Sequence, residues 1–184
     1  KDRSNVLVTG AAGYIGSHMI SRLLSNGDHN PIGTSRRSLP GAVCPVAHVD
    51  MTGDDWTTAL PESCKTVIHL AQSTRYREFP EGAEDMMRVN VQATVQLLEW
   101  ARTHDVDRFI FASTASVYKP IHRPVTETDR REPTTFYGAT KLAAENLVQC
   151  YIDYFDVIIC RIFTVYGPGQ KDKLVPGILN RIRT

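Results

Sequence analysis

The sequence predicts an α/β protein built on a doubly wound parallel sheet. Short apolar runs rich in β-branched residues alternate with longer segments whose apolar residues recur every three or four positions. The composition, with 42% hydrophobic and 22% charged residues, is that of a globular domain. Strands that alternate with helices form βαβ units, and their right-handed crossovers keep the strands parallel.

Six segments have the character of buried strands, because each is a short apolar run bounded by turn residues. The expected strands are residues 5–9, 31–35, 43–49, 66–70, 108–112 and 156–163.

Three helices are expected between the strands. After Gly16, apolar residues recur at helical spacing until Asn26-Gly27, a typical helix C-terminus. Two longer helical patterns cover residues 84–102 and 136–154. The pattern breaks at Gly167, and an apolar stretch over 174–182 has little predicted structure to pack against.

A glycine-rich turn joins the first strand to the first helix and carries the first functional signal. Gly10 permits a tight turn, Gly13 lets a phosphate approach the backbone, and Gly16 lets helix and strand pack closely. The first helical N–H groups, including those of Tyr14 and Ile15, are then free to bind an anion. In this context the turn predicts a Rossmann-like site for NAD or NADP.

The end of the second strand bears on the choice between the two cofactors. An NAD site commonly has an acid here that binds the ribose 2′-hydroxyl. The sequence has Thr34 at about this position, followed by Ser35, Arg36 and Arg37. Guanidinium groups bind a 2′-phosphate well, so NADP is the favoured cofactor and NAD the alternative. The alternative for the arginines themselves is a solvated surface position.

Tyr137 and Lys141 are four residues apart on a predicted helix, and therefore share a face. A nearby cation lowers the pKa of a phenol, which makes it a better base. Such a tyrosine can exchange a proton with an alcohol oxygen while hydride moves at the adjacent carbon. Taken alone, the spacing is also that of an ordinary pair on a half-exposed helix.

Six segments in order resemble the extended short-chain dehydrogenase/reductase group, also called the NAD-dependent epimerase/dehydratase family. They are TGAAGYIG (9–16), HLAQS (69–73), NV (90–91), FASTASVY (111–118), YGATK (137–141) and RIFTVYGPGQ (161–170). Together they span nearly the whole chain.

The resemblance implies roles for individual residues. Tyr137 would be the catalytic acid/base, Lys141 would bind the nicotinamide ribose and lower the pKa of Tyr137, and Thr114, with Ser113 beside it, would bind the reacting oxygen. Cofactor contacts are implied for Asp50, Met51, Leu70, Ala71, Gln72 and Asn90, and substrate contacts for Thr74, Thr114 and Thr164. Outside the resemblance, each hydroxyl could equally be a cap or a buried hydrogen bond.

Three departures from the family pattern limit the expected activity. Ala115 and Ser116 stand where sugar dehydratases of the family carry acids, which argues against a 4,6-dehydratase. Lys119 replaces a usual Gly. Thr164 replaces an Asn that often contacts the substrate diphosphate, which makes a nucleotide-diphosphate substrate less secure.

The domain organisation predicted is a cofactor-binding domain over residues 1–165 and the beginning of an incomplete substrate-binding domain over 166–184. The favoured function is an NAD(P)-dependent sugar-nucleotide epimerase that works through a keto intermediate. The alternatives are an NADPH-dependent carbonyl reductase or dehydrogenase, and a cofactor-binding fragment without activity.

Charge and composition exclude several partners. With 21 basic and 20 acidic side chains the net charge is +1, which predicts no nucleic-acid or membrane partner. Four scattered cysteines without a CxxC pair predict no metal site. Without a recognisable signal sequence, a cytoplasmic protein is expected. The two long helices could form a homodimer face, as the resemblance suggests.

Overall fold

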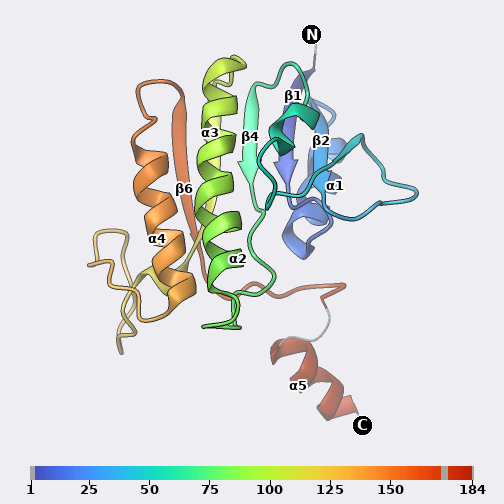
Figure 1. Ribbon diagram of the computed structural model, residues 1–184. Helices are drawn as coiled ribbons and strands as arrows, with labels where there is room; N and C mark the ends of the chain where they lie inside the picture. Colours follow the sequence, from blue (N-terminus) through green and yellow to red (C-terminus); the bar gives the residue numbers. More distant parts are fainter. Residues whose placement is uncertain (1–2, 171–173, 184) are drawn as a thin grey trace.

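A computed structural model describes residues 3–170 and 174–183 of the chain and shows one six-stranded sheet. The strand order is β3-β2-β1-β4-β5-β6, and every adjacent pair is parallel. The strands are β1 (Ser4–Thr9), β2 (His29–Ser35), β3 (Val46–His48), β4 (Thr66–His69), β5 (Arg108–Thr114) and β6 (Asp156–Ile162). The predicted doubly wound α/β fold is confirmed (Figure 1).

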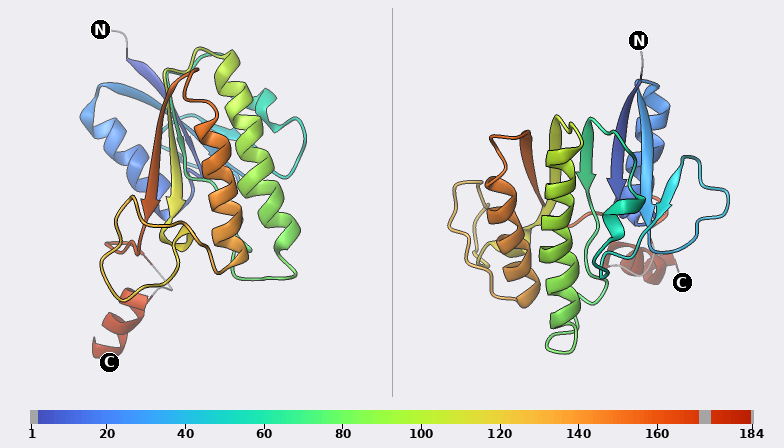
Figure 2. Two further views of the ribbon diagram at one scale, coloured as in Figure 1. Left: turned by 90° about the vertical axis from the view of Figure 1, so that its left-hand side faces the viewer. Right: turned by 45° about the horizontal axis from the view of Figure 1, so that its top comes forward.

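Helices cover both faces of this sheet. Helix α1 (Tyr14–Asn26) lies on one face, whereas α3 (Ala93–Thr103) and α4 (Phe136–Gln149) lie on the other (Figure 2). The remaining helices are α2 (Ala83–Met87), α5 (Leu174–Arg183), the 3-10 turns Trp56–Ala59 and Ala115–Val117, and a π turn at Arg88–Gln92.

The core lies on both sides of the central strands, because successive residues of β1 point to opposite faces. Leu7 is fully buried beneath α3 and α4, with Val67 and Phe109 of the neighbouring strands. Val6 and Val8 face the other way and pack beneath α1. Strands buried on both faces explain why β1 and β4 are continuous apolar runs in the sequence.

Several predicted elements differ from those of the structure. β2 begins at His29 and β5 ends at Thr114, so each is two residues longer than predicted. The third strand covers only Val46–His48, because β3 is an edge strand that pairs with three residues of β2. Helix α4 ends at Gln149, and the chain then turns until β6 begins, so residues 150–154 are not helical. The predicted helix over 84–102 is a continuous column, but the π turn divides it into α2 and α3.

The chain after Tyr166 contains α5, whose Ile178 and Ile182 side chains are 47% and 75% exposed. Figure 1 shows this helix below the carboxyl ends of the strands, away from the sheet. The predicted domain boundary between residues 165 and 166 stays a prediction. In the described part of the chain, no helix combines the length and apolar character that crossing a bilayer requires.

Candidate active site

One cavity of about 1590 Å³ opens along the carboxyl ends of the strands. It extends across β1 and β4, the adjacent strands at which the order of the sheet reverses. Ligands of open α/β sheets bind in this crevice, because loops and helix N-termini converge there. The sheet topology therefore places the glycine turn and Tyr137 on one cavity.

The glycine turn forms one wall of the cavity. Gly10 has a φ of +68°, and a Cβ atom there would lie 3.0 Å from the backbone nitrogen of Ala71. At Gly16, a Cβ atom would collide with the carbonyl oxygen of Gly10. The turn is therefore confined to glycine at both positions, since a side chain would separate β1, β4 and α1.

The N-terminus of α1 is uncapped and faces the cavity. Gly13 is the N-cap residue, and no side chain bonds to the N–H groups of the first turn. Gly13, Tyr14, Ile15 and Gly16 all line the cavity. Bare N–H groups at a helix N-terminus bind phosphate, so this wall fits the pyrophosphate of a dinucleotide.

Ser35, Arg36 and Arg37 follow the same rim at the end of β2. The Ser35 hydroxyl accepts a hydrogen bond from the Arg37 N–H at 3.1 Å, which fixes the turn. Hydrogen bonds from the backbone and side chain of Thr52 lower the pKa of Asp50, and the charge of Arg36 contributes to the same shift. An ionised carboxylate and two guanidinium groups thus surround this end of the cavity.

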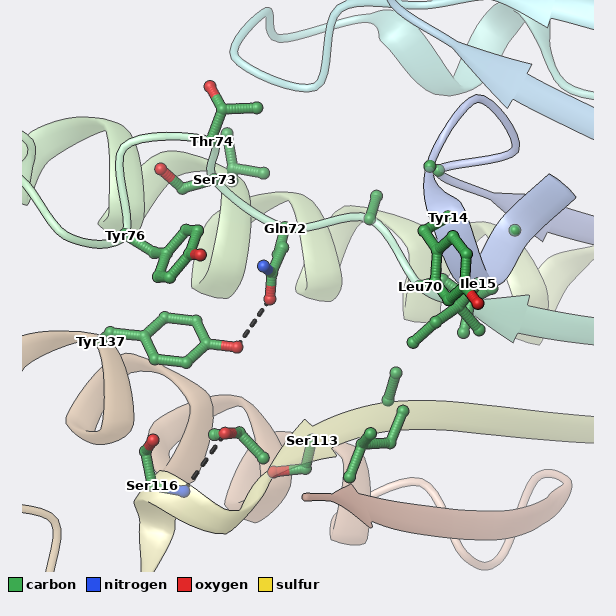
Figure 3. Close-up of a pocket in the computed structure, with 18 of the residues that line it drawn as sticks. Tyr14, Ile15, Leu70, Gln72, Ser73, Thr74, Tyr76, Ser113, Ser116 and Tyr137 are labelled. Atoms are coloured by element: carbon green, nitrogen blue, oxygen red, sulfur yellow. Dashed lines mark hydrogen bonds between the residues drawn. The ribbon is translucent and has the colours of Figure 1, made fainter. Parts of the chain in front are cut away.

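Tyr137 lies at the other end, at the start of α4. Its hydroxyl donates a hydrogen bond of 2.6 Å to Oε1 of Gln72, from the segment after β4 (Figure 3). Burial raises the pKa of Tyr137, while a hydrogen bond with Thr114 acts in the opposite direction. Thr114 ends β5, and its hydroxyl accepts the Ser116 N–H at 3.2 Å. The phenol thus lies near two polar side chains, one from the segment after β4 and one from the end of β5.

Lys141 is 2% exposed and lies beneath the cavity rather than on its wall. Its ammonium group is 4.1 Å from the centroid of the Phe111 ring. Burial lowers the pKa of Lys141 to about 7, although the charge of Glu145 opposes this shift. Burial raises the pKa of Tyr137 in the free chain. The lowering of that pKa by Lys141 stays a prediction.

Ser113 has a hydrogen-bond partner behind the cavity. Its hydroxyl donates to Oε1 of Glu145, a completely buried carboxylate on α4. Thr114, not Ser113, is the β5 hydroxyl that influences the pKa of Tyr137. Ser113 is therefore engaged by Glu145, and the roles of Ser113 and Thr114 at the reacting oxygen stay predictions.

Asn90 is 1% exposed and lies in the π turn, outside the lining of the cavity. Its side-chain oxygen accepts the N–H of Ser73 at 2.9 Å, and its amide nitrogen donates to the Thr140 hydroxyl at 3.1 Å. Thr140 in turn donates to the carbonyl oxygen of Tyr137 at 2.8 Å. Asn90 thus ties the segment after β4 to the first turn of α4.

Apart from Asn90 and Lys141, every residue singled out from the sequence for a site role lines this cavity. These residues are Gly10, Gly13, Tyr14, Ile15, Gly16, Ser35, Arg36, Arg37, Asp50, Met51, Leu70, Ala71, Gln72, Thr74, Ser113, Thr114, Tyr137 and Thr164. Their individual roles stay predictions. Ala115 and Ser116 also line it and place no acid beside Thr114.

Several other groups at the site were not predicted from the sequence. Tyr76, Arg77 and Phe79 line the cavity from the long segment before α2, which carries no motif. The ring centroids of Tyr76 and Tyr137 are 5.4 Å apart. Glu145 was also missed, although a carboxylate one turn after Lys141 on an otherwise apolar helix face is a signal that could have revealed it.

The sequence and the fold are both similar to those of known proteins. The sequence profile described as the NAD dependent epimerase/dehydratase family matches residues 6–184. This chain belongs to that family. A Bacillus subtilis (strain 168) member, named as the uncharacterized UDP-glucose epimerase YtcB, is 35% identical over 183 residues, which cover 90% of this chain and 58% of the relative.

Solved structures of family members share the fold. MoeE5 in complex with UDP-glucose and NAD is 36% identical with a TM-score of 0.81, covering 96% of this chain and 60% of that one. A UDP-glucuronic acid 4-epimerase from Bacillus cereus in complex with NAD is 30% identical with a TM-score of 0.79, covering 91% and 58%. The chain spans less than two thirds of the length of these relatives.

Proposed function

We propose that this chain is the cofactor-binding and catalytic part of an NAD(P)-dependent epimerase that acts on a nucleotide sugar. The observation that carries the proposal is the single cavity that joins the uncapped N-terminus of α1 to Tyr137. One end fits a dinucleotide pyrophosphate, and the other presents a phenol to a sugar hydroxyl. Family members of known structure bind NAD together with UDP-sugars, in keeping with this assignment.

The residues of the chain would divide the chemistry as follows. The free N–H groups at the N-terminus of α1 would hold the pyrophosphate of a nicotinamide dinucleotide. This cofactor would supply reversible hydride exchange with a sugar carbon, by way of a keto sugar, and a positive charge that lowers the pKa of Tyr137. Tyr137, once ionised, takes the proton of the sugar hydroxyl and later gives it back. Thr114 orients the oxygen, and Lys141 lies one helical turn beyond Tyr137 to favour the phenolate.

We propose NAD as the cofactor, because structures of family members at 30% and 36% identity contain NAD. The NADP preference predicted from the sequence stays a prediction. It is supported by Arg36 and Arg37, both on the cavity rim after β2, and by Thr34 in place of an acid. A 2′-phosphate would find two guanidinium groups at this position.

The decisive experiment measures cofactor binding by calorimetry and then turnover of UDP-glucose and UDP-glucuronic acid. Tyr137→Phe is expected to reduce turnover by about a hundredfold or more, the usual contribution of a general acid/base. Its affinity for NAD is expected to stay within a few-fold of the unchanged chain. A folded chain without affinity for NAD or NADP, or full turnover in Tyr137→Phe, would contradict the proposal.

A carbonyl reductase is the second candidate, and the arginine pair is the observation that favours it, since NADPH commonly drives reduction. Net consumption of NADPH separates the two activities, because an epimerase returns its hydride to the same molecule. Binding of a cofactor without either reaction would instead support the third prediction, a cofactor-binding fragment.

Two further predictions accompany the proposed function. A homodimer through the long helices α3 and α4 is tested by sedimentation of the purified chain. The cytoplasmic location is tested by fractionation of the source cells.

A further inference from the structure

Gln72, in the segment after β4, has its side chain in direct contact with the phenol of Tyr137. The carbonyl oxygen of Gln72 accepts from the Tyr137 hydroxyl at 2.6 Å, which is short for a neutral O–H···O bond. Both residues line the cavity, so the bond lies where a substrate hydroxyl would approach (Figure 3). The sequence suggested only a cofactor contact for Gln72.

The spacing of this pair is fixed by buried neighbours. Ser73, directly after Gln72, is 1% exposed, and its hydroxyl donates to Asp85 while its N–H donates to Asn90. On the other side, Asn90 reaches the first turn of α4 through Thr140. One buried amide thus holds the backbones on both sides of the Gln72–Tyr137 bond.

We propose that Gln72 is a positioning residue for the acid/base tyrosine. Its amide oxygen adds to the stabilisation of the protonated phenol by burial, and directs the O–H bond across the cavity until a sugar hydroxyl replaces the amide. The inference rests on the proposed function for its catalytic meaning. The contact itself is independent of any reaction, because an acceptor beside a neutral phenol stabilises the protonated form in the free chain.

A second tyrosine, Tyr151, illustrates how a carboxylate acceptor affects the pKa of a phenol in this chain. Tyr151 donates a hydrogen bond of 2.5 Å to the carboxylate of Glu99. Burial, together with that bond and the charge of Glu99, raises the pKa of Tyr151 to about 12. A carboxylate in place of the Gln72 amide would reproduce this pairing at Tyr137.

Other titratable and charged groups near Tyr137 do not supply the same acceptor. The Tyr76 ring packs 5.4 Å from the Tyr137 ring, and the Arg77 guanidinium lies 5.2 Å from the centroid of Tyr76. Lys141 is the buried cation one turn along α4. None of these groups would change when residue 72 is substituted, so a shift in the pKa of Tyr137 would report on residue 72.

The test uses the full chain labelled with tyrosine carrying 13C at Cζ. Its Tyr137 resonance is assigned by its loss in Tyr137→Phe, and the pKa is read from a pH titration. Gln72→Glu is expected to raise the pKa of Tyr137 by about one pH unit or more, a tenfold change in the ionisation equilibrium. Thr74→Glu, the matched control on the same cavity wall, is expected to give a much smaller rise.

Equal shifts in Gln72→Glu and Thr74→Glu, or no shift in either, would overturn the inference, because the effect of residue 72 would then need no direct bond. Gln72→Leu provides a second variant without added charge. Its Tyr137 resonance is expected to move from the position in the unchanged chain at neutral pH, and an unmoved resonance would also overturn the contact. Since no substrate is used, this outcome is distinct from a failure of the epimerase proposal.

Discussion

The Arg161 guanidinium forms a bidentate ion pair with the carboxylate of Glu145, in which Nε lies 3.0 Å from Oε1 and Nη2 lies 2.9 Å from Oε2. Glu145 is completely buried, and Ser113 and Arg131 complete its surroundings. The pair joins β6 to α4 directly behind the cavity. Arg161 also donates to the Tyr118 hydroxyl at 2.6 Å, which extends the connection to the loop after β5.

Glu145→Gln is expected to destabilise the chain by about 3 kcal/mol, because it leaves a partly buried guanidinium without its counter-charge. Urea denaturation measures the free energy of unfolding. Glu84→Gln is the control, since the exposed Glu84–Arg88 pair should contribute less than about 1 kcal/mol. Equal losses in the two variants would show that burial gives the Glu145 pair no special weight.

Lys141→Met is expected to stabilise the chain at pH 7 by about 1 kcal/mol or more while it abolishes turnover. The folded-state pKa of Lys141, about 7, lies below its unfolded value near 10.4. Folding the unchanged chain therefore releases a proton between these pH values, and its stability rises with pH across this window. The gain in the free energy of unfolding from Lys141→Met should be largest below pH 7 and should shrink toward pH 10. A gain that is constant with pH would contradict the low pKa of Lys141.

If the Arg36 guanidinium binds a 2′-phosphate, Arg36→Ala is expected to lower the affinity for NADPH about tenfold or more and the affinity for NADH by less than threefold. Calorimetric titration of each cofactor into the purified chain measures both affinities. Arg37→Ala, on the same rim, shows whether one arginine or both contribute. Equal losses of affinity for NADPH and NADH would contradict a 2′-phosphate contact and would instead indicate that Arg36 is a solvated surface residue.

Asn90→Ala is expected to cost about 1–3 kcal/mol, because the buried N–H of Ser73 would lose its acceptor. Denaturation with urea gives this value directly. Asn146→Ala is the matched control, since Asn146 is exposed on α4 and should change stability by less than about 0.5 kcal/mol. A neutral result for Asn90→Ala would mean that water or another group satisfies Ser73.

Local patterns were sufficient to predict most of the fold and the cavity wall. The apolar runs at β1 and β4 and the glycines before α1 depend on adjacent residues, so they can be read from the chain directly. The bonds of Gln72, Glu145 and Asn90 join residues 16 to 65 positions apart. Such pairs depend on how the elements pack, and a tyrosine pKa that depends on burial is equally invisible before packing is known.

The π turn at Arg88–Gln92 sets a limit on how this chain could be re-engineered. A π turn holds one more residue than an α-helical turn, so every position after it is rotated relative to those before it. Deleting one residue there would give a more regular helix, yet would turn the Asn90 amide away from Ser73 and Thr140. In this column, regularising the helix and keeping the loop after β4 in place are therefore opposed design goals.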